Sequence, residues 1–146
     1  MKNRKKVRIK IVELTPPKNG KRGRIKYNGK EPLPHEKKTI KCLSKYGFDV
    51  ETIIPSNMPG SHNPDILMMG TFWEMKGPTS INKNTIKNRF EKAKKQADGR
   101  AIFDLRNIKH DTTKTKYDII ELFTTTRGMR RILVVEKGDK ILDITK

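Results

Sequence analysis

The chain has 146 residues, which suits one domain with a modest core, because 33% of the residues are hydrophobic and 34% are charged. Thirty-four lysines and arginines against 16 acidic residues give a net charge of +18, so nucleic acid is the expected partner. A ribosome-associated or membrane-surface protein is the alternative. No apolar run suits a membrane span or a signal peptide, and the single cysteine, Cys42, excludes an internal disulfide, so we expect a cytoplasmic protein with no membrane partner.

Residues 1–33 are predicted to form a basic N-terminal arm or linker. A candidate strand, VRIKIVEL, lies at residues 7–14, and the segment that follows is rich in proline, glycine, lysine and arginine. This composition is typical of a flexible segment, so we expect the domain boundary near residues 32–34 and a folded domain over residues 34–146.

From residue 34 onward, helical and strand patterns alternate. A helix is predicted to begin at Pro34 and end at Gly47, since proline suits a first turn and glycine a C-cap. Further helices are predicted over 84–97 and 116–127, and strands over 48–54, 65–69, 71–76, 100–105, 130–136 and 140–145. The order indicates an α/β fold with a central mixed sheet flanked by helices.

The most apolar stretch, NPDILMMGTFWEMKGP at residues 63–78, carries three charged side chains inside its predicted strands. Asp65 follows a proline at the mouth of the first strand. Glu74 and Lys76 lie in the second strand, separated by one residue. Trp73 and Met75 alternate with them and are therefore interpreted as core residues.

The turn of this hairpin has two candidate positions. A turn at residues 69–70 places Asp65 opposite Glu74, whereas a turn at 70–71, with glycine first, places Asp65 opposite Lys76. Both registers put the three side chains on one face, because side chains alternate along a strand.

Two neighbouring carboxylates repel unless a cation lies between them. Mg²⁺ or Mn²⁺ would relieve the conflict, since Mg²⁺ is commonly held by one or two carboxylates together with water and substrate phosphate. Lys76 could then hold the attacking water or neutralise charge that develops at phosphorus. The alternative is a salt-bridged cluster at a sheet edge.

The PD…EMK pattern resembles the PD-(D/E)xK nuclease superfamily, whose restriction-endonuclease-like core has the same order of elements over residues 34–146. The wider text, SHNPDILMMGTFWEMKGPTS and NTIKNRFEKAKKQADGRAIFDLR, is similar to the C-terminal tRNA nuclease domains of contact-dependent growth inhibition toxins and their free-standing relatives in bacterial mobile elements. The resemblance implies metal-dependent cleavage of RNA, with Asp65 and Glu74 as metal ligands and Lys76 as the catalytic lysine.

The resemblance also implies a further ligand, Glu36, on the inward face of the first helix. Its alternatives are a first-turn acid favoured by the helix dipole, or Glu51 in the same role. Nucleic-acid contacts are expected from His62, Lys87, Arg89, Lys94, Lys95, Gln96 and Arg106. A loop histidine, a solvated basic helix face and a pairing of Arg106 with Asp104 are the respective alternatives. His35 and His110 are interpreted as surface residues.

Three functions therefore stay open at this point. The first is a metal-dependent nuclease acting on RNA, with tRNA favoured by the resemblance alone. The second is a DNA endonuclease of a phage or mobile element, and the third is a non-catalytic nucleic-acid-binding protein. If the chain is toxic, an acidic immunity or inhibitor protein is an expected partner.

Overall fold

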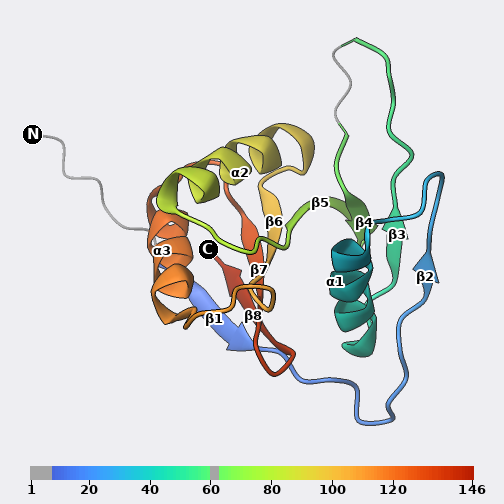
Figure 1. The fold of residues 1–146 in the computed structure, drawn as a ribbon, viewed down its shortest axis with the longest axis horizontal. Helices are drawn as coiled ribbons and strands as arrows, with labels where there is room; N and C mark the ends of the chain where they lie inside the picture. The colour runs from blue at the N-terminus through green and yellow to red at the C-terminus, as the bar shows by residue number, and fades with distance from the viewer. Residues whose placement is uncertain (1–7, 60–62) are drawn as a thin grey trace, which may run out of the picture.

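The computed structural model describes residues 8–59 and 63–146. These residues form one mixed sheet with helices on both of its faces (Figure 1). The strands are β1 (Lys10–Glu13), β2 (Ile25–Lys26), β3 (Val50–Thr52), β4 (Ile66–Met68), β5 (Thr71–Lys76), β6 (Arg100–Asp104), β7 (Arg131–Glu136) and β8 (Lys140–Thr145). The helices are α1 (Pro34–Lys45), α2 (Lys83–Gln96) and α3 (Thr113–Thr125). This architecture confirms the predicted α/β fold with a central mixed sheet.

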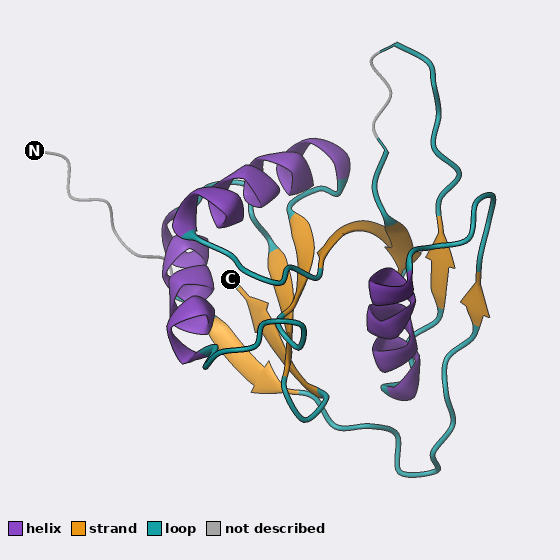
Figure 2. Ribbon diagram, in the orientation of Figure 1, coloured by secondary structure: helices purple, strands orange, loops and turns teal. Residues whose placement is uncertain are grey.

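The strands are arranged in the order β1-β8-β7-β6-β5-β4-β3-β2. The strands β5, β6 and β7 run parallel to one another, and β2 runs parallel to β3; the remaining pairs are antiparallel. The described part of the connection between β3 and β4 extends away from the sheet (Figure 2). The strands β4 and β5 form a hairpin in the middle of the sheet, and β6 lies beside β5 and runs parallel to it.

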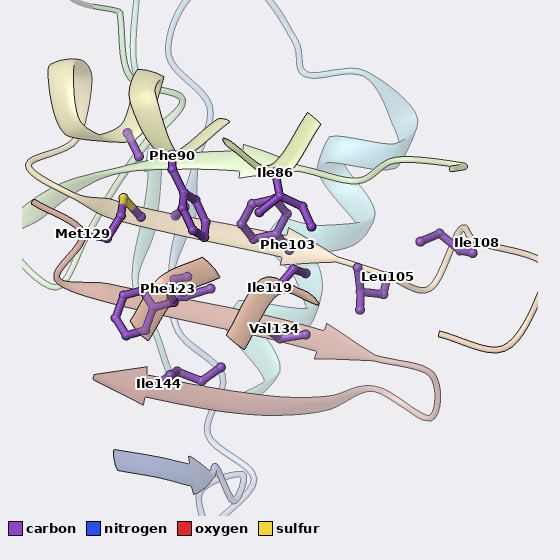
Figure 3. Packing of buried hydrophobic residues seen from close by; sticks show 13 residues of the cluster. Ile86, Phe90, Phe103, Leu105, Ile108, Ile119, Phe123, Met129, Val134 and Ile144 are labelled. Atoms are coloured by element: carbon purple, nitrogen blue, oxygen red, sulfur yellow. The ribbon is translucent and has the colours of Figure 1, made fainter. Parts of the chain in front are cut away.

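Two buried clusters, one on each face, hold the layers together. Helices α2 and α3 pack on β6, β7 and β8 through Phe90, Phe103 and Phe123, among others (Figure 3). Helix α1 packs on the opposite face through Ile40 and Leu43. The alternation along β6 and β7 explains this division, because Ala101 and Phe103 belong to the first cluster whereas Ile102 belongs to the second.

The helix ends show where local chemistry decides the boundary. Helix α1 begins at Pro34, and Gly47 follows it with φ +88°, as predicted. Helix α2 begins earlier than predicted, because the side chain of Asn82 accepts the Thr85 N–H at 2.9 Å. Helix α3 likewise begins at Thr113, whose N–H is bound by Asp111 at 2.9 Å.

The described part of the predicted arm contributes both edge strands of the sheet. The first, β1, lies within the candidate strand at residues 7–14 and pairs with β8, and β2 pairs with β3. These pairings tie residues 10–26 to the sheet at both ends. The division of the chain between residues 33 and 34 stays a prediction.

The hairpin turn lies at residues 69–70, which confirms the first of the two predicted registers. Ile66 pairs with Trp73 and Met68 with Thr71. Met69 has φ +54° and Gly70 has φ +72°, and two positive φ angles in succession define a type I′ turn, which follows the twist of paired strands. Glycine therefore occupies the second position of the turn, where the alternative register required it at the first.

Candidate active site

A pocket of about 200 Å³ opens at the carboxyl end of β5, between the first turns of α1 and the middle of α2. Its lining combines acids and bases from segments that are far apart in the sequence. The lining residues are His35, Glu36, Thr39, Asp65, Met75, Lys76, Gly77 and Arg89. Three of the four predicted catalytic residues are among them, and the fourth, Glu74, lies beside them.

Asp65 and Glu74 are neighbours at the point where the β4–β5 ladder ends. The Asp65 N–H donates to the carbonyl of Trp73 at 3.1 Å, and its carboxylate accepts the N–H of Met75 at 2.7 Å. These two bonds bracket Glu74, which lies between Trp73 and Met75. The two carboxylates thus meet on one face, as the hairpin register predicts.

Both carboxylates lie in surroundings that disfavour their charge. Burial raises the pKa of Asp65 above its ordinary 3.8, outweighing the Met75 N–H and the charge of Arg89. Burial also raises the pKa of Glu74 above 4.5, and the neighbouring charge of Asp65 adds to the rise. Glu74 is only 3% exposed. A pair of desolvated acids of this kind is typical of functional sites.

Two side chains from α2 compensate part of this charge. Arg89 Nη1 donates to Glu74 Oε2 at 3.1 Å, and the guanidinium-bearing side chain is 19% exposed. In the amide orientation that its neighbours require, Gln96 donates to Glu74 Oε1 at 3.0 Å and to the Asn63 carbonyl at 2.7 Å. Arg89 was expected to contact a phosphate backbone, but here it lies inside the pocket on a carboxylate. Gln96 reaches the site through Glu74, and its expected contact with nucleic acid stays a prediction.

Glu36 and Lys76 complete the pocket from opposite sides. The carboxylate of Glu36 accepts the Leu33 N–H at 2.9 Å, which is the capping role of a first-turn acid, and its charge also raises the pKa of Asp65. The interpretation of Glu36 as a first-turn acid therefore describes its contact, and its role as a metal ligand stays a prediction. Lys76 is half-buried in the lining, two residues beyond Glu74 on the same face.

The structure places several other candidates away from the pocket. Asp104 and Asp139 both bind the Arg106 guanidinium at 2.7 Å, and the side chain is only 8% exposed, so the pairing interpretation holds, while a contact of Arg106 with nucleic acid stays a prediction. Glu51 binds Asn28 at 2.7 Å on another part of the sheet. His62 lies outside the described residues.

The lysines of α2 divide into two groups. Lys87 and Lys95 are exposed, and their contact with nucleic acid stays a prediction. Lys94 instead pairs with Glu91 at 2.7 Å and lies beside Gly128. Lys92, which the sequence reading did not single out, is exposed, and its charge lowers the pKa of both Asp65 and Glu74.

Sequence reasoning missed His35 and Thr39 in the pocket lining. His35 is exposed at the rim, and Thr39 is buried and donates to Asp104 at 2.6 Å. For Thr39, the sequence offered one signal. It lies three positions after Glu36, and residues at this spacing share one face of a helix. Trp73 is fully buried and donates to the Met68 carbonyl at 3.0 Å, which confirms its core assignment.

The oxygen ligands in the pocket fit a hard divalent cation as a pair of carboxylates. The described residues contain no group of three His, Cys, Asp or Glu side chains that could enclose a metal ion. They do contain two adjacent carboxylates with raised pKa values, and such a pair suits Mg²⁺ or Mn²⁺ that keeps water and substrate oxygens as its other ligands. Asp65 and Glu74 are the residues that would hold the ion.

The fold and this pocket define an α/β domain that carries two desolvated carboxylates within a strongly basic chain. Residues 62–141 match the family described as the contact-dependent growth inhibition CdiA C-terminal domain, and the chain belongs to that family. The resemblance to growth inhibition toxins is thus confirmed at the level of the family.

Among solved structures, a chain of the CdiA-CT/CdiI toxin and immunity complex from Burkholderia pseudomallei is similar to this chain, with a TM-score of 0.60 and 18% sequence identity. The alignment covers 83% of this chain and 99% of that chain, so the likeness in fold extends over nearly all of the neighbour. No curated protein sequence matches the chain. None of the helices in the described residues is long and apolar enough to cross a membrane.

Proposed function

We propose that the protein is a toxin domain that hydrolyses phosphodiester bonds in RNA, with Asp65 and Glu74 holding Mg²⁺ or Mn²⁺ and Lys76 as the catalytic lysine. The observation that carries the proposal is the pair of desolvated carboxylates, Asp65 and Glu74, beside Lys76 at an open pocket. Family membership supports the toxic role. The spacing PD…EMK supports assignment to the PD-(D/E)xK nucleases.

The proposed roles follow from the charge of each group. A divalent cation, when bound, supplies positive charge for the incoming phosphate and makes water acidic enough to yield a nucleophile near neutral pH. Lys76 stabilises the negative charge that develops on the phosphate oxygens, since an ammonium group in a partly desolvated pocket acts more strongly than in water. Glu36 and His35 are in position to orient water at the rim of the pocket.

The proposed substrate and the proposed partner follow from the net charge of the chain and from its family. The net charge of +18, with exposed Lys87, Lys92 and Lys95 on α2 beside the pocket, favours a polyanionic substrate. The tRNA assignment comes from the family resemblance. Because the structural neighbour is a toxin and immunity complex, we also propose that an acidic immunity protein binds this basic surface.

The decisive experiment is an incubation of the purified protein with total tRNA and, separately, with supercoiled plasmid, each with Mg²⁺ or with EDTA. We expect tRNA to be cleaved only with the metal. Glu74→Gln and Lys76→Ala are expected to lower the rate at least about 100-fold, in the range found when an electrostatic catalytic group is removed. Glu121→Gln and Lys114→Ala, on the exposed side of α3, are the matched controls.

The outcomes separate the candidate functions. Plasmid nicking without tRNA cleavage would replace RNA by DNA as the substrate, and binding without turnover would leave a non-catalytic protein. Full activity of Glu74→Gln would remove the proposed site. Independently of activity, Mg²⁺ should raise the melting temperature of the wild type and not that of Glu74→Gln, because ligand binding to the folded state stabilises it.

A further inference from the structure

In the described part of the chain, no helix covers one face of the half of the sheet formed by β2, β3, β4 and the start of β5. Helices α2 and α3 pack against β6, β7 and β8 on that face, and α1 lies on the other (Figure 1). Phe72, at the start of β5, is consequently 45% exposed, and Met69 in the adjoining turn is 41% exposed. Two neighbouring exposed apolar side chains on an uncovered sheet face form a candidate contact surface for a ligand.

The strand register places a row of side chains across this uncovered face. Lys26 pairs with Glu51, Glu51 with Leu67, and Leu67 with Phe72. Opposed residues on neighbouring strands point to the same side, so the four side chains form one line perpendicular to the strands. Its apolar end is formed by the exposed Phe72 and the half-buried Leu67.

This row lies directly beside the proposed catalytic acids. Phe72 and Glu74 are two residues apart on β5, and Leu67 and Asp65 are two residues apart at the mouth of β4, so all four point to one face. Two residues of extended strand span about 6.7 Å. That distance corresponds to one step of an extended nucleic-acid strand, so a base next to the scissile phosphate would reach Phe72.

A pocket with charged walls continues the surface on the far side of Leu67. Its volume is about 490 Å³, and its lining includes the exposed cations Arg24 and Lys26 and the acids Asp49 and Glu51. Lys26 Nζ lies 3.9 Å from Glu51 Oε1, and a phosphate bound by Arg24 and Lys26 would take the place of this contact. A duplex would present only its outer edges here, because its bases are stacked on one another.

We propose that Phe72 and Leu67 form a stacking platform for an unpaired base adjacent to the scissile phosphate, with Arg24 and Lys26 binding the strand beyond it. The inference rests on the proposed function of the neighbouring acids and deepens it: the protein acts on a single-stranded segment of RNA. Phe72 is a positioning residue, and its ring supplies a face on which any base can stack.

The test measures binding, so that it does not depend on cleavage. Variants are made in Glu74→Gln protein with EDTA, and their affinity for a short unstructured RNA is compared with that for the same RNA carrying abasic sites and for a fully paired duplex. We expect Phe72→Ala to weaken binding of the unstructured RNA about tenfold, since stacking of one base contributes a factor of this order. Phe72→Tyr should retain affinity, and Phe72→Leu should not.

The abasic RNA, the duplex and one control variant show whether the loss of affinity is specific to base stacking on Phe72. Affinity for the abasic RNA and the duplex should change less than about twofold in every Phe72 variant. Tyr117→Ala, which removes an aromatic ring that is 61% exposed on α3, should leave all three affinities unchanged. Thermal melting of each variant verifies the fold.

Two results would overturn the platform. One is unchanged affinity of Phe72→Ala for unstructured RNA, and the other is an equal loss on the abasic RNA or the duplex. Because no cleavage is scored, an inactive wild type would refute the nuclease proposal while leaving this test intact. Conversely, an active wild type whose Phe72→Ala variant binds normally would refute the platform alone.

Discussion

At the scale of single residues, the pocket holds two buried carboxylates whose charge is only partly compensated by neighbouring side chains. Asp65 and Glu74 are brought together by the hairpin and kept from water, and Arg89 and Gln96 bind one of the two. The pKa values of both acids stay raised in spite of these partners. The native state therefore carries a destabilising charge at this position, which is a common trade-off at functional sites.

Glu74→Gln is therefore expected to stabilise the protein near neutral pH in the absence of metal. Because the pKa of Glu74 is higher in the folded state than its ordinary 4.5, the wild type loses stability as the pH rises from 4.5 through the folded-state pKa. The amide does not ionise, so the variant should gain on the order of 1 kcal/mol at about pH 8, a gain that fades toward pH 4.

Urea unfolding in EDTA at several pH values measures this difference, with Glu121→Gln as the control. A variant less stable than the wild type at about pH 8 would mean that the ion pair with Arg89 outweighs the burial of Glu74. In that case the carboxylate would have a structural role, as in the salt-bridged interpretation of the sequence.

The candidate acids could be recognised from the sequence, but the side chains that bind them could not. Asp65, Glu74 and Lys76 lie close in sequence, and strand alternation suffices to place them on one face. The pairing of Arg106 with Asp104, two residues away, was one of the interpretations of the sequence. Its second partner could not be predicted in this way, because Asp139 is 33 residues away and reaches it only through the pairing of β6, β7 and β8. Arg89 on Glu74 has the same origin, since it depends on how α2 crosses β5.

At the scale of elements, the β4–β5 hairpin fixes the geometry of the site. Its sequence allowed two turns, and both kept the acids on one face, so the face was predictable while the register was not. The observed type I′ turn gives Met69 a φ of +54°, a conformation that asparagine and glycine adopt more readily than methionine.

Met69→Asn should consequently stabilise the hairpin by about 1 kcal/mol, the order of the penalty for a left-handed residue other than glycine, asparagine or aspartate. The Asn-Gly dipeptide keeps the same turn, so the strand register should stay unchanged. Urea unfolding measures the gain, and Met58→Asn, at a position 71% exposed in the preceding loop, is the matched control. Equal stability of Met69→Asn and wild type would show that the turn is not strained.

The shortest elements were the hardest to predict from the sequence. Strand β2 has two residues, Ile25 and Lys26, and the segment around it is rich in proline, glycine and lysine, as a linker is. It is a strand because Arg24 and Asn28 are bound by β3: the Val50 N–H donates to the Arg24 carbonyl at 2.8 Å, and the Asn28 N–H donates to Thr52 at 2.7 Å. Such long-range bonds leave no periodic signal in the sequence.

At the scale of the whole molecule, the basic N-terminal segment joins the two ends of the sheet. Strand β1 covers the edge of β8 over four residue pairs, and β2 covers the edge of β3. Ile9 and Leu14 pack against the buried clusters on opposite faces. The same segment supplies Arg24 and Lys26 to the proposed RNA path, so charge and edge protection lie in one stretch of chain.

A chain limited to residues 34–146 should therefore be much less stable than the full chain and should self-associate. Its loss of β1 and β2 removes backbone hydrogen bonds and exposes two strand edges, which readily pair with other chains. Thermal melting and light scattering measure the effect, and a chain starting at residue 8 is the control that keeps both strands. If residues 34–146 instead stay monomeric and melt with the full chain, the segment before residue 34 is a separable arm, and its described strands contribute binding surface but no stability.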